Sequence, residues 1–353
     1  MRTLEMCAGA GGQAIGLHEA GAEHVGLIEL DPHAYQTLRW NNQRLGLGWG
    51  DIHHQDLRVF AKRDAKRYRD VVDLVAGGVP CPPFSKAGRQ LGGQDDRDLF
   101  PTALEIVRHV RPKAVLLENV PGLLESKFAS YREGIVKSLV RLGYVGEWRL
   151  LQASDYGVPQ LRPRAVLVAL QTQYADFFSW PEPDLTPPVT VGEALFDLMS
   201  SRGWPGALKW KRKANKIAPT LVGGSHKHGG PDLGPTRAKR QWQELGVYPH
   251  RVGDDFEIPT RGFKGVLMRS GEIKPGFEGM PLLTVRMAAR LQGFPDYWEF
   301  SGAKTHAYRQ IGNAFPPPVA FALGRQIRIA LDSAVGARNI GRKRDVSITK
   351  VYA

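Results

Sequence analysis

The sequence predicts an α/β protein in which a parallel sheet is covered by helices on both faces and is joined to a smaller, irregular domain. Short apolar runs alternate with helical patterns through the first half of the chain. The periodicity then fades over residues 200–275, where Gly, Pro and basic residues become more frequent. A chain of 353 residues is long enough for one large domain and a smaller one.

Each predicted strand is a short apolar run bounded by Gly, Pro or polar residues. The predicted strands span residues 2–6, 25–29, 71–76, 114–118, 148–152 and 165–170. Asp31 followed by Pro32 is typical of a helix start, and it predicts a helix that continues through Asn42. Apolar residues at helical spacing predict further helices over residues 98–110, 130–142, 285–292 and 319–331.

These elements predict how the chain is divided. We expect residues 1–178 to form the larger domain and residues 305–335 to complete it. Prolines near residues 180–188 indicate a linker, so residues 179–304 are expected to form the smaller domain and its hinge. The polar and basic segment 336–353 is expected to be a frayed tail.

Positive charge is concentrated in the middle of the chain. The formal net charge is +13, and residues 200–275 hold fifteen Lys or Arg against six Asp or Glu, a difference of +9. Tryptophan, tyrosine and phenylalanine residues are interleaved with these charges. Charge alone also fits a basic protein with no special partner, but its concentration in one segment favours a polyanionic partner.

The cysteine and histidine content excludes several classes of protein. Two cysteines, Cys7 and Cys81, cannot form a disulfide framework or a Cys-rich zinc site. His226 and His228 lie in a Gly-rich polar segment with no further ligand cluster, so we expect no metal. No apolar run reaches the length of a signal peptide or of a membrane span, and we expect a cytoplasmic protein.

A glycine-rich loop follows the first predicted strand. Gly9, Gly11 and Gly12 would allow a tight turn and a close approach of the backbone to a ligand. Glu29 ends the next strand, where a carboxylate can accept hydrogen bonds from ribose hydroxyls. The spacing Gly9-x-Gly11-x-x-Ala14 predicts a nucleotide-like cofactor and does not by itself separate NAD from S-adenosylmethionine (AdoMet).

Two reactive side chains are predicted at the same edge of the sheet. Cys81 follows a buried strand that ends in glycines, and it stands between two prolines that stiffen the backbone. Glu118 ends the following strand, and a carboxyl group there can donate or accept a proton. Ligands of open parallel sheets bind beyond the carboxyl ends of the strands, so Cys81 is a candidate nucleophile.

Taken together, these segments make the chain resemble the bacterial DNA (cytosine-5)-methyltransferases of restriction–modification type. The matching segments occur in the family's order and span nearly the whole chain except the basic insert. They are Cys7 to Gly12, Glu29, Asp56-Leu57, Pro80-Cys81, Glu118-Asn119-Val120, Gln160-Leu-Arg162-Pro-Arg164, Arg290-Leu-Gln-Gly-Phe-Pro295 and Gln310-Ile-Gly-Asn313-Ala-Phe-Pro-Pro.

The resemblance implies a Rossmann-like AdoMet-dependent methyltransferase domain with a smaller target-recognition domain. Cys81 is expected to attack carbon 6 of cytosine while Glu118 protonates or hydrogen-bonds ring nitrogen 3. Arg164, supported by Arg162, is expected to hold the flipped base. Carbon 5 then takes the methyl group, a base removes the proton at carbon 5, and elimination frees the enzyme. Rotating the base out of the duplex costs a few kcal/mol, which phosphate contacts offset.

The resemblance also implies two binding surfaces. The residues expected to bind AdoMet are Cys7, Ala8, Gly9, Gly11, Gly12, Glu29, Leu30, Asp56, Leu57, Gly78, Pro80, Asn313 and Ala314. The residues expected to contact DNA are Ser85, Gln160, Lys211, Arg212, Lys213, Thr220, Arg237, Lys239 and Arg240. The segment that begins at Arg290 is expected to support the insert and to take no part in the chemistry.

The chain departs from the family pattern at three places. Cys7 stands where many members have a phenylalanine that stacks on the adenine, and Pro82 stands where many have glutamine. The acid expected to bind the adenine is Asp56, although Asp51 is an alternative, because Asp56-Leu57-Arg58 is closer to the family's pattern.

Alternatives from other classes remain open on the sequence. An RNA cytosine-5 methyltransferase would use the same chemistry. An NAD-dependent dehydrogenase would explain only the glycine-rich loop, and an inactive DNA-binding relative would not need Cys81 and Glu118. For the first hypothesis we expect double-stranded DNA as partner, a monomer, and a cognate restriction endonuclease that cuts the same site.

Overall fold

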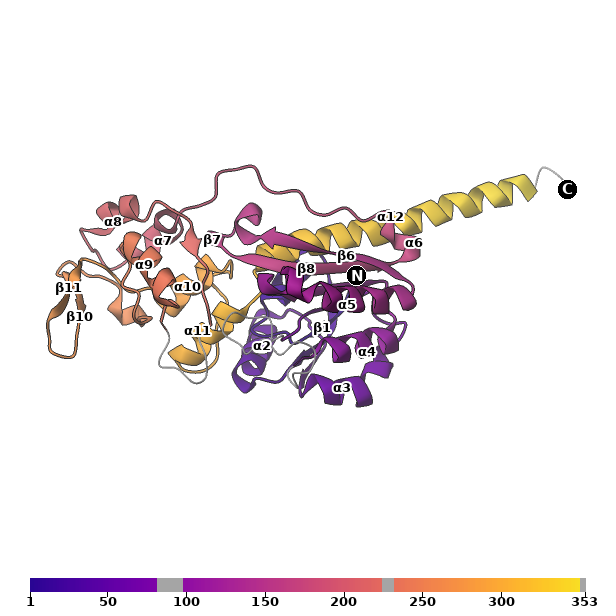
Figure 1. The fold of residues 1–353 in the computed structure, drawn as a ribbon, viewed down its shortest axis with the longest axis horizontal. Helices are drawn as coiled ribbons and strands as arrows, with labels where there is room; N and C mark the ends of the chain where they lie inside the picture. The colour runs from indigo at the N-terminus through magenta and orange to yellow at the C-terminus, as the bar shows by residue number, and fades with distance from the viewer. Residues whose placement is uncertain (81–97, 224–231, 350–353) are drawn as a thin grey trace.

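The computed structural model describes residues 1–80, 98–223 and 232–349, with side chains described as far as residue 336. Figure 1 shows a larger lobe built on a sheet and a smaller lobe beyond one end of that sheet. Cys81, Ser85, His226 and His228 lie outside the described residues.

The larger lobe contains a sheet of seven strands in the order β3-β2-β1-β4-β5-β8-β6. Its strands are β1 (Arg2–Met6), β2 (Glu23–Glu29), β3 (Asp51–His54), β4 (Leu74–Gly78), β5 (Ala114–Asn119), β6 (Tyr144–Gln152) and β8 (Pro163–Gln171). All six predicted strands are present. The strand predicted over residues 71–76 begins later, at Leu74, and β3 was missed because its Asp-Ile-His-His sequence has only one aliphatic side chain.

The prediction of an entirely parallel sheet is wrong for one strand. β8 pairs antiparallel with both β5 and β6, whereas β1 to β5 pair in parallel. The chain between β6 and β8 spans only residues 153–162 and contains no helix long enough to cross the sheet. A short connection of this kind permits an antiparallel neighbour, whereas a parallel pair needs a longer crossover.

Helices cover both faces of the sheet. One face packs on α3 (Leu57–Arg63), α4 (Phe100–Val110) and α5 (Ala129–Arg141) through a core that includes Phe60, Phe100 and Leu139. The other face packs on α1 (Gly12–Glu19) and on the last helix, α12 (Pro317–Thr349). The C-terminal part of the chain therefore completes the lobe that the N-terminal part begins.

The last helix is longer than expected. Residues 336–353 were predicted to fray, but α12 continues to Thr349 and extends beyond the sheet (Figure 1). This segment contains no proline, the residue that most strongly ends a helix, and its arginine, lysine and alanine residues favour one. Among the described residues, no helix is both long and apolar enough to cross a bilayer.

The smaller lobe is built from short elements. They are α7 (Val191–Ser200), α8 (Ala207–Lys213), β9 (Ala218–Pro219), α9 (Thr236–Glu244), β10 (Gly265–Leu267), β11 (Ile273–Glu278), α10 (Val285–Leu291) and α11 (Lys304–Asn313). Trp210 and Trp242 are buried in its core, which continues into the larger lobe through Ile15, Leu38 and Trp49. The two lobes thus share apolar packing.

Two connections join the lobes besides this core. The predicted linker leaves α6 (Thr172–Ala175) and has no helix or strand before α7. The short strand β7 (Gln160–Leu161), which precedes β8, pairs in parallel with β9 of the smaller lobe.

The predicted helix after Asp31 is confirmed as α2 (Pro32–Leu45). The Asp31 carboxylate accepts hydrogen bonds from the backbone N–H groups of His33 and Ala34, each at 2.9 Å.

The contact between α1 and α12 depends on Gly16. A Cβ atom at Gly16 would lie 2.1 Å from the Pro317 carbonyl oxygen and 2.7 Å from the Ala320 Cβ atom. No side chain fits at that distance without moving one helix away from the other. The glycine therefore sets how closely the two helices approach.

We predict that Gly16→Ala lowers the free energy of unfolding by about 1–3 kcal/mol because it overpacks this contact. The matched control is Gly134→Ala in α5, where a Cβ atom would meet nothing within 4 Å. There the higher helix propensity of alanine should raise stability by about 0.5–1 kcal/mol. Urea denaturation of both variants measures the difference, and equal effects of the two substitutions would contradict the prediction.

Candidate active site

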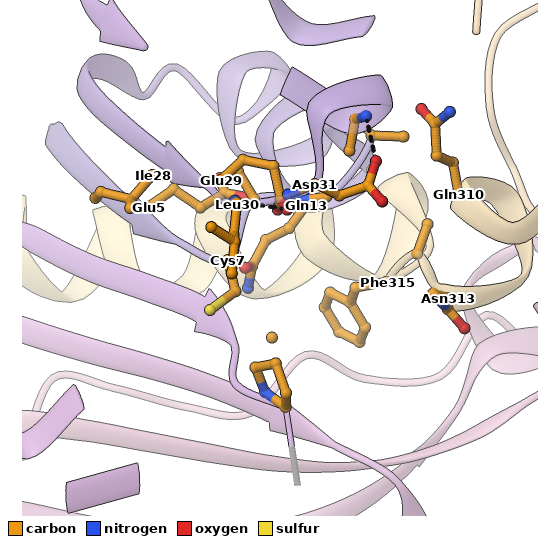
Figure 2. A pocket seen from close by; sticks show the side chains of 18 of the residues that line it. Glu5, Cys7, Gln13, Ile28, Glu29, Leu30, Asp31, Gln310, Asn313 and Phe315 are labelled. Atoms are coloured by element: carbon orange, nitrogen blue, oxygen red, sulfur yellow. Dashed lines mark hydrogen bonds between the residues drawn. The ribbon is translucent and has the colours of Figure 1, made fainter. Parts of the chain in front are cut away.

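A cavity of about 360 Å³ opens beyond the carboxyl ends of the central strands (Figure 2). This volume lies in the range of small-molecule sites. Its lining comes from the loop after β1, the ends of β2, β4 and β5, the start of α3, and α11 with the turn that follows it. Of the residues expected to bind the cofactor, it includes Cys7, Ala8, Gly9, Glu29, Leu30, Asp56, Leu57, Gly78, Pro80, Asn313 and Ala314, together with Gly12.

Glu29 connects two loops of the cavity. Its carboxylate accepts hydrogen bonds from the backbone N–H groups of Gly9 (2.7 Å), Leu30 (2.8 Å) and Asp31 (2.7 Å). Burial raises the pKa of Glu29, while these hydrogen bonds lower it. Because Gly9 has a φ of +55°, the turn needs a glycine there, and Glu29 then fixes the turn against the end of β2.

Gly11 does not line the cavity, contrary to the prediction. It has a φ of +86°, and a Cβ atom there would lie 3.0 Å from Leu38 and 3.1 Å from Trp298. Gly11 therefore allows the loop to pack under these side chains. The Nε1 atom of Trp298 donates a hydrogen bond of 3.0 Å to the carbonyl of Ala10, which holds the same loop from the smaller lobe.

The position of the two candidate acids favours Asp56 over Asp51. Asp56 lines the cavity beside Leu57, and its carboxylate caps α3 by accepting from the N–H of Arg58 at 2.7 Å. Asp51 starts β3, is exposed, and is not among the lining residues.

Cys7 lines the cavity but has the properties of an unreactive thiol. Burial raises the pKa of Cys7 well above its ordinary value, and the carboxylates of Glu29 and Asp56 raise it further. The reactive form of cysteine is the thiolate, so Cys7 does not qualify as a nucleophile.

Glu118, the predicted proton donor or acceptor, lines the same cavity. The Nε atom of Arg164 lies 2.7 Å from Oε1 of Glu118, and both side chains are nearly buried. The other carboxyl oxygen is 3.0 Å from the position that a Cβ atom of Gly78 would occupy. The carboxyl group therefore lies at the end of β4, next to the strand end that leads to Cys81.

Burial and two neighbouring guanidinium groups act on the pKa of Glu118 in opposite directions. Desolvation raises the pKa of Glu118 above its ordinary value of 4.5, and the nearby guanidinium groups of Arg164 and Arg162 lower it by a smaller amount. A raised pKa suits a carboxyl group that donates a proton. The Nδ2 atom of Asn119 donates 2.9 Å to the carbonyl of Val79, which fixes the end of β4 beside it.

Arg162 and Gln160 are fully buried, which corrects the prediction that Gln160 contacts DNA and leaves Arg162 the supporting part expected of it, away from the cavity. The Arg162 guanidinium donates to the carbonyls of Leu221 (2.7 Å), Gly312 (2.7 Å) and Ala314 (3.0 Å) and does not line the cavity. The Gln160 amide bonds the main chain of Leu221 and the side chain of Gln292, so Gln160 has no surface to offer DNA. Arg162 thus positions the surrounding backbone instead of touching a substrate.

Sequence reasoning missed much of the lining. The side chains it missed include Gln13, Gln55, Asp31, Phe315 and, on one face of α11, His306, Arg309 and Gln310. The spacing of residues 306, 309, 310 and 313 is that of one helix face, so this signal was present in the sequence. The sequence does not show that this face of α11 lies against the ends of β1 and β2.

The predicted DNA contacts have mixed positions. Arg212, Lys213, Arg237 and Arg240 are exposed on α8 and α9. Lys211 is half-buried over the ring of Phe196, and Lys239 pairs with Asp232 at 2.6 Å. The hydroxyl of Thr220 donates to the carbonyl of Leu161 at 2.5 Å, which links the smaller lobe to β7.

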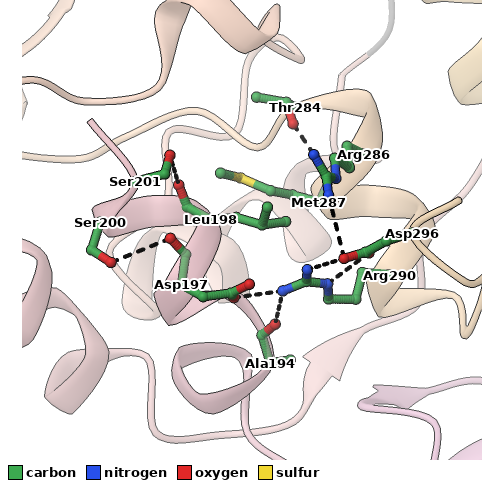
Figure 3. A network of polar contacts seen from close by, with 10 residues as sticks. All are labelled: Ala194, Asp197, Leu198, Ser200, Ser201, Thr284, Arg286, Met287, Arg290 and Asp296. Atoms are coloured by element: carbon green, nitrogen blue, oxygen red, sulfur yellow. Dashed lines mark hydrogen bonds and ion pairs between the residues drawn. The ribbon is translucent and has the colours of Figure 1, made fainter. Parts of the chain in front are cut away.

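Arg290 forms the polar network of Figure 3, as expected for a supporting residue. Its guanidinium contacts Asp197 of α7 at 2.5 Å and Asp296 in the turn after α10 at 2.9 Å. The same group donates to the carbonyl of Ala194 at 3.1 Å. The network joins α7 to α10 and lies outside the lining of the cavity.

In the described part of the chain, no cluster of His, Cys, Asp and Glu could hold a metal ion.

Comparisons with known proteins show the family of this chain. The family described as C-5 cytosine-specific DNA methylase matches residues 1–328. The Type II methyltransferase M.NgoMIV of Neisseria gonorrhoeae is 51% identical over 329 residues, which cover 93% of this chain and 97% of the relative. The Type II methyltransferase M.NaeI of Lentzea aerocolonigenes is 53% identical over 333 residues, which cover 94% of this chain and 76% of the relative.

Solved structures show the same fold. A putative DNA modification methyltransferase encoded within an E. coli prophage has a TM-score of 0.61 at 23% identity, covering 94% of this chain and 99% of that one. A mutant of DNMT2 from Spodoptera frugiperda has a TM-score of 0.60 at 16% identity, with the same coverage of both chains.

We predict that Glu118→Gln changes the pH dependence of stability. Because the folded pKa of Glu118 is raised, its contribution to stability is complete below pH 4.5 and is lost as the pH rises through the folded pKa. The glutamine variant lacks this loss, so the difference in free energy of unfolding should shift in its favour as the pH rises above about 4.5. Urea denaturation between pH 4.5 and 8 measures the slope. Parallel curves for the variant and the wild type would contradict the raised pKa.

Proposed function

Because this chain belongs to the C-5 cytosine-specific DNA methylases, we propose that Cys81 is its nucleophile and that Glu118 and Arg164 activate and hold the target cytosine. The protein is a DNA (cytosine-5)-methyltransferase, and AdoMet supplies the methyl group. Family membership excludes the NAD-dependent dehydrogenase and favours DNA over RNA as substrate.

The observation that carries the proposal is the position of the Glu118 carboxyl group. It lies against the end of β4, close to where the chain continues through Pro80 to Cys81, and it lines the cavity. Arg164 pairs with one carboxyl oxygen, and the other oxygen lies toward Gly78. In the proposed reaction Glu118 gives a proton to ring nitrogen 3 while the Cys81 sulfur bonds to carbon 6. Carbon 5 then takes the methyl group, loses its proton to a base, and the sulfur–carbon bond breaks.

The residues that would hold AdoMet fit that molecule. Asp56 and Leu57 would contact the adenine and Glu29 the ribose. Gly9, Gly12 and Asn313 would lie toward the amino-acid end. The cavity combines carboxylates, exposed backbone of a glycine turn and apolar surface, which suits a nucleoside with a charged chain.

We further propose that the protein modifies a duplex site read by the insert and protects host DNA from a cognate endonuclease. The close relatives are Type II methyltransferases, which supports this role. The exposed basic side chains of α8 and α9 would contact phosphates, and residues 179–304 would form the recognition domain. We propose that the protein acts as a monomer in the cytoplasm.

We predict that a duplex carrying 5-fluorocytosine at the target position becomes covalently attached to the wild-type protein. Fluorine cannot leave as a proton does, so the sulfur–carbon bond should persist. Cys81→Ser should give no covalent complex and no methyl transfer while retaining AdoMet binding. Denaturing gel electrophoresis after incubation with AdoMet detects the complex. A complex formed equally well by Cys81→Ser would refute the assignment of the nucleophile.

We also predict that neutralising Lys211, Arg212 and Lys213 together flattens the salt dependence of DNA binding. Each phosphate contact that is lost should reduce the slope of log K against log salt by roughly 0.9. The matched control neutralises Lys62, Arg63 and Lys66, which are exposed on the opposite lobe and remove the same charge. Binding titrations at several salt concentrations measure both slopes. Equal slopes for the two triple variants would remove α8 from the phosphate-contacting surface.

A further inference from the structure

Two polar side chains that line the cofactor cavity have buried atoms with neither a hydrogen bond nor an ion pair in the described part of the chain. Both the oxygen and the nitrogen of the Gln13 amide are unpaired, and Gln13 is only 4% exposed. The Nε and Nη1 atoms of Arg309 are also buried and unpaired. Figure 2 shows Gln13 among the side chains of the cavity, with its amide on the side of Cys7.

Unpaired groups of this kind destabilise the protein unless a ligand completes them. A buried amide without a partner costs free energy, and a buried guanidinium without one costs more. Among the other buried polar side chains of the cavity, the Glu5 carboxylate has no hydrogen bond but lies 3.3 Å from the His24 ring nitrogen, and Glu29 and Gln310 are hydrogen-bonded. The Glu29 carboxylate accepts three backbone hydrogen bonds, and the Gln310 amide bonds Thr37, Ser301 and His306. Gln13 and the two buried Arg309 nitrogens have neither a hydrogen bond nor an ion pair among the described residues, which points to a missing partner.

The charges of the cavity indicate what that partner is. Glu29, Asp31 and Asp56 lie at the ends of β2 and β3, on the side expected to hold the nucleoside. Arg309 is the one Lys or Arg among the described lining residues. AdoMet carries an α-carboxylate and an α-ammonium group at its amino-acid end. A guanidinium matches a carboxylate, and an amide can both donate to a carboxylate and accept from an ammonium group.

Gln13 and Arg309 also belong to elements that meet. Gln13 follows Gly12 at the start of α1, and a Cβ atom at Gly12 would lie only 2.4 Å from the Phe315 carbonyl oxygen and 3.1 Å from the Ala314 Cβ atom. Arg309 stands one turn before Asn313 on the face of α11 that lines the cavity. The start of α1 and the end of α11 thus enclose the same end of the cavity.

We propose that Arg309 binds the α-carboxylate of AdoMet and that Gln13 binds the same amino-acid group through its amide. The assignment rests on the family's cofactor and is independent of the covalent step at Cys81. It makes the cavity selective for ligands that keep the complete amino-acid end.

Calorimetric titration in the absence of DNA tests the assignment. The ligands are S-adenosylhomocysteine, which keeps the amino-acid end, and 5′-methylthioadenosine, which lacks it. Arg309→Met should weaken the binding of S-adenosylhomocysteine roughly 10- to 100-fold, because the substitution removes a charge-assisted hydrogen bond. Gln13→Leu should weaken it by a smaller factor, and both variants should bind methylthioadenosine within about two-fold of the wild type. The matched control is Arg325→Met, an exposed arginine of α12, which should bind both ligands as the wild type does.

A second comparison uses the wild-type protein alone, in case Arg309→Met does not fold. Decarboxylated AdoMet lacks only the carboxylate and should bind at least about ten-fold more weakly than AdoMet. Equal affinities for these two ligands would overturn the proposal. So would an Arg309→Met variant that keeps wild-type affinity for S-adenosylhomocysteine or that loses affinity for both ligands equally. If Arg309→Met lost methyl transfer but bound both ligands as the wild type does, the proposed contact between Arg309 and the carboxylate would be wrong. The proposed role of Cys81 would be unaffected.

Discussion

The buried guanidinium of Arg162 connects the three parts of the molecule on which the site depends. It donates to a carbonyl of the smaller lobe at Leu221 and to two carbonyls that flank Asn313, at Gly312 and Ala314. Leaving the buried Nη atoms without these carbonyls would cost free energy, so the contacts hold the three backbone segments together. Gln160 reinforces the contact by bonding Leu221 and Gln292.

The contacts of Arg162 also affect the position of side chains at the cavity. Arg164 follows Arg162 by two residues and leaves the buried network to pair with Glu118 at the rim of the cavity. One side of the cavity is formed by α11, whose end is held by Arg162. One short segment of chain thus fixes the positions of the Glu118 carboxyl group and of α11 relative to each other. A small displacement of that segment would therefore move both Glu118 and α11.

The two lobes divide their charges according to their tasks. In the cavity, acidic groups from the sheet face a single arginine among the described lining residues, which suits a ligand with both signs of charge. The insert carries most of the excess positive charge, and several of its basic side chains are exposed on α8 and α9. Phosphate contacts need exposed cations, whereas cofactor binding needs buried and paired ones.

Local signals in the sequence determined the strands, the Asp31 cap and the acids at the strand ends, because these depend on neighbouring residues. They also identified Glu29 and Glu118 as lining residues, whereas Asp56 was chosen by its resemblance to the family's pattern. Only the tertiary structure decided that β8 runs antiparallel, that Gln160 and Arg162 are buried, and that Gln13 meets the same cavity as Arg309. These facts depend on contacts between segments far apart in the chain, and no local pattern encodes which buried polar group will face which partner.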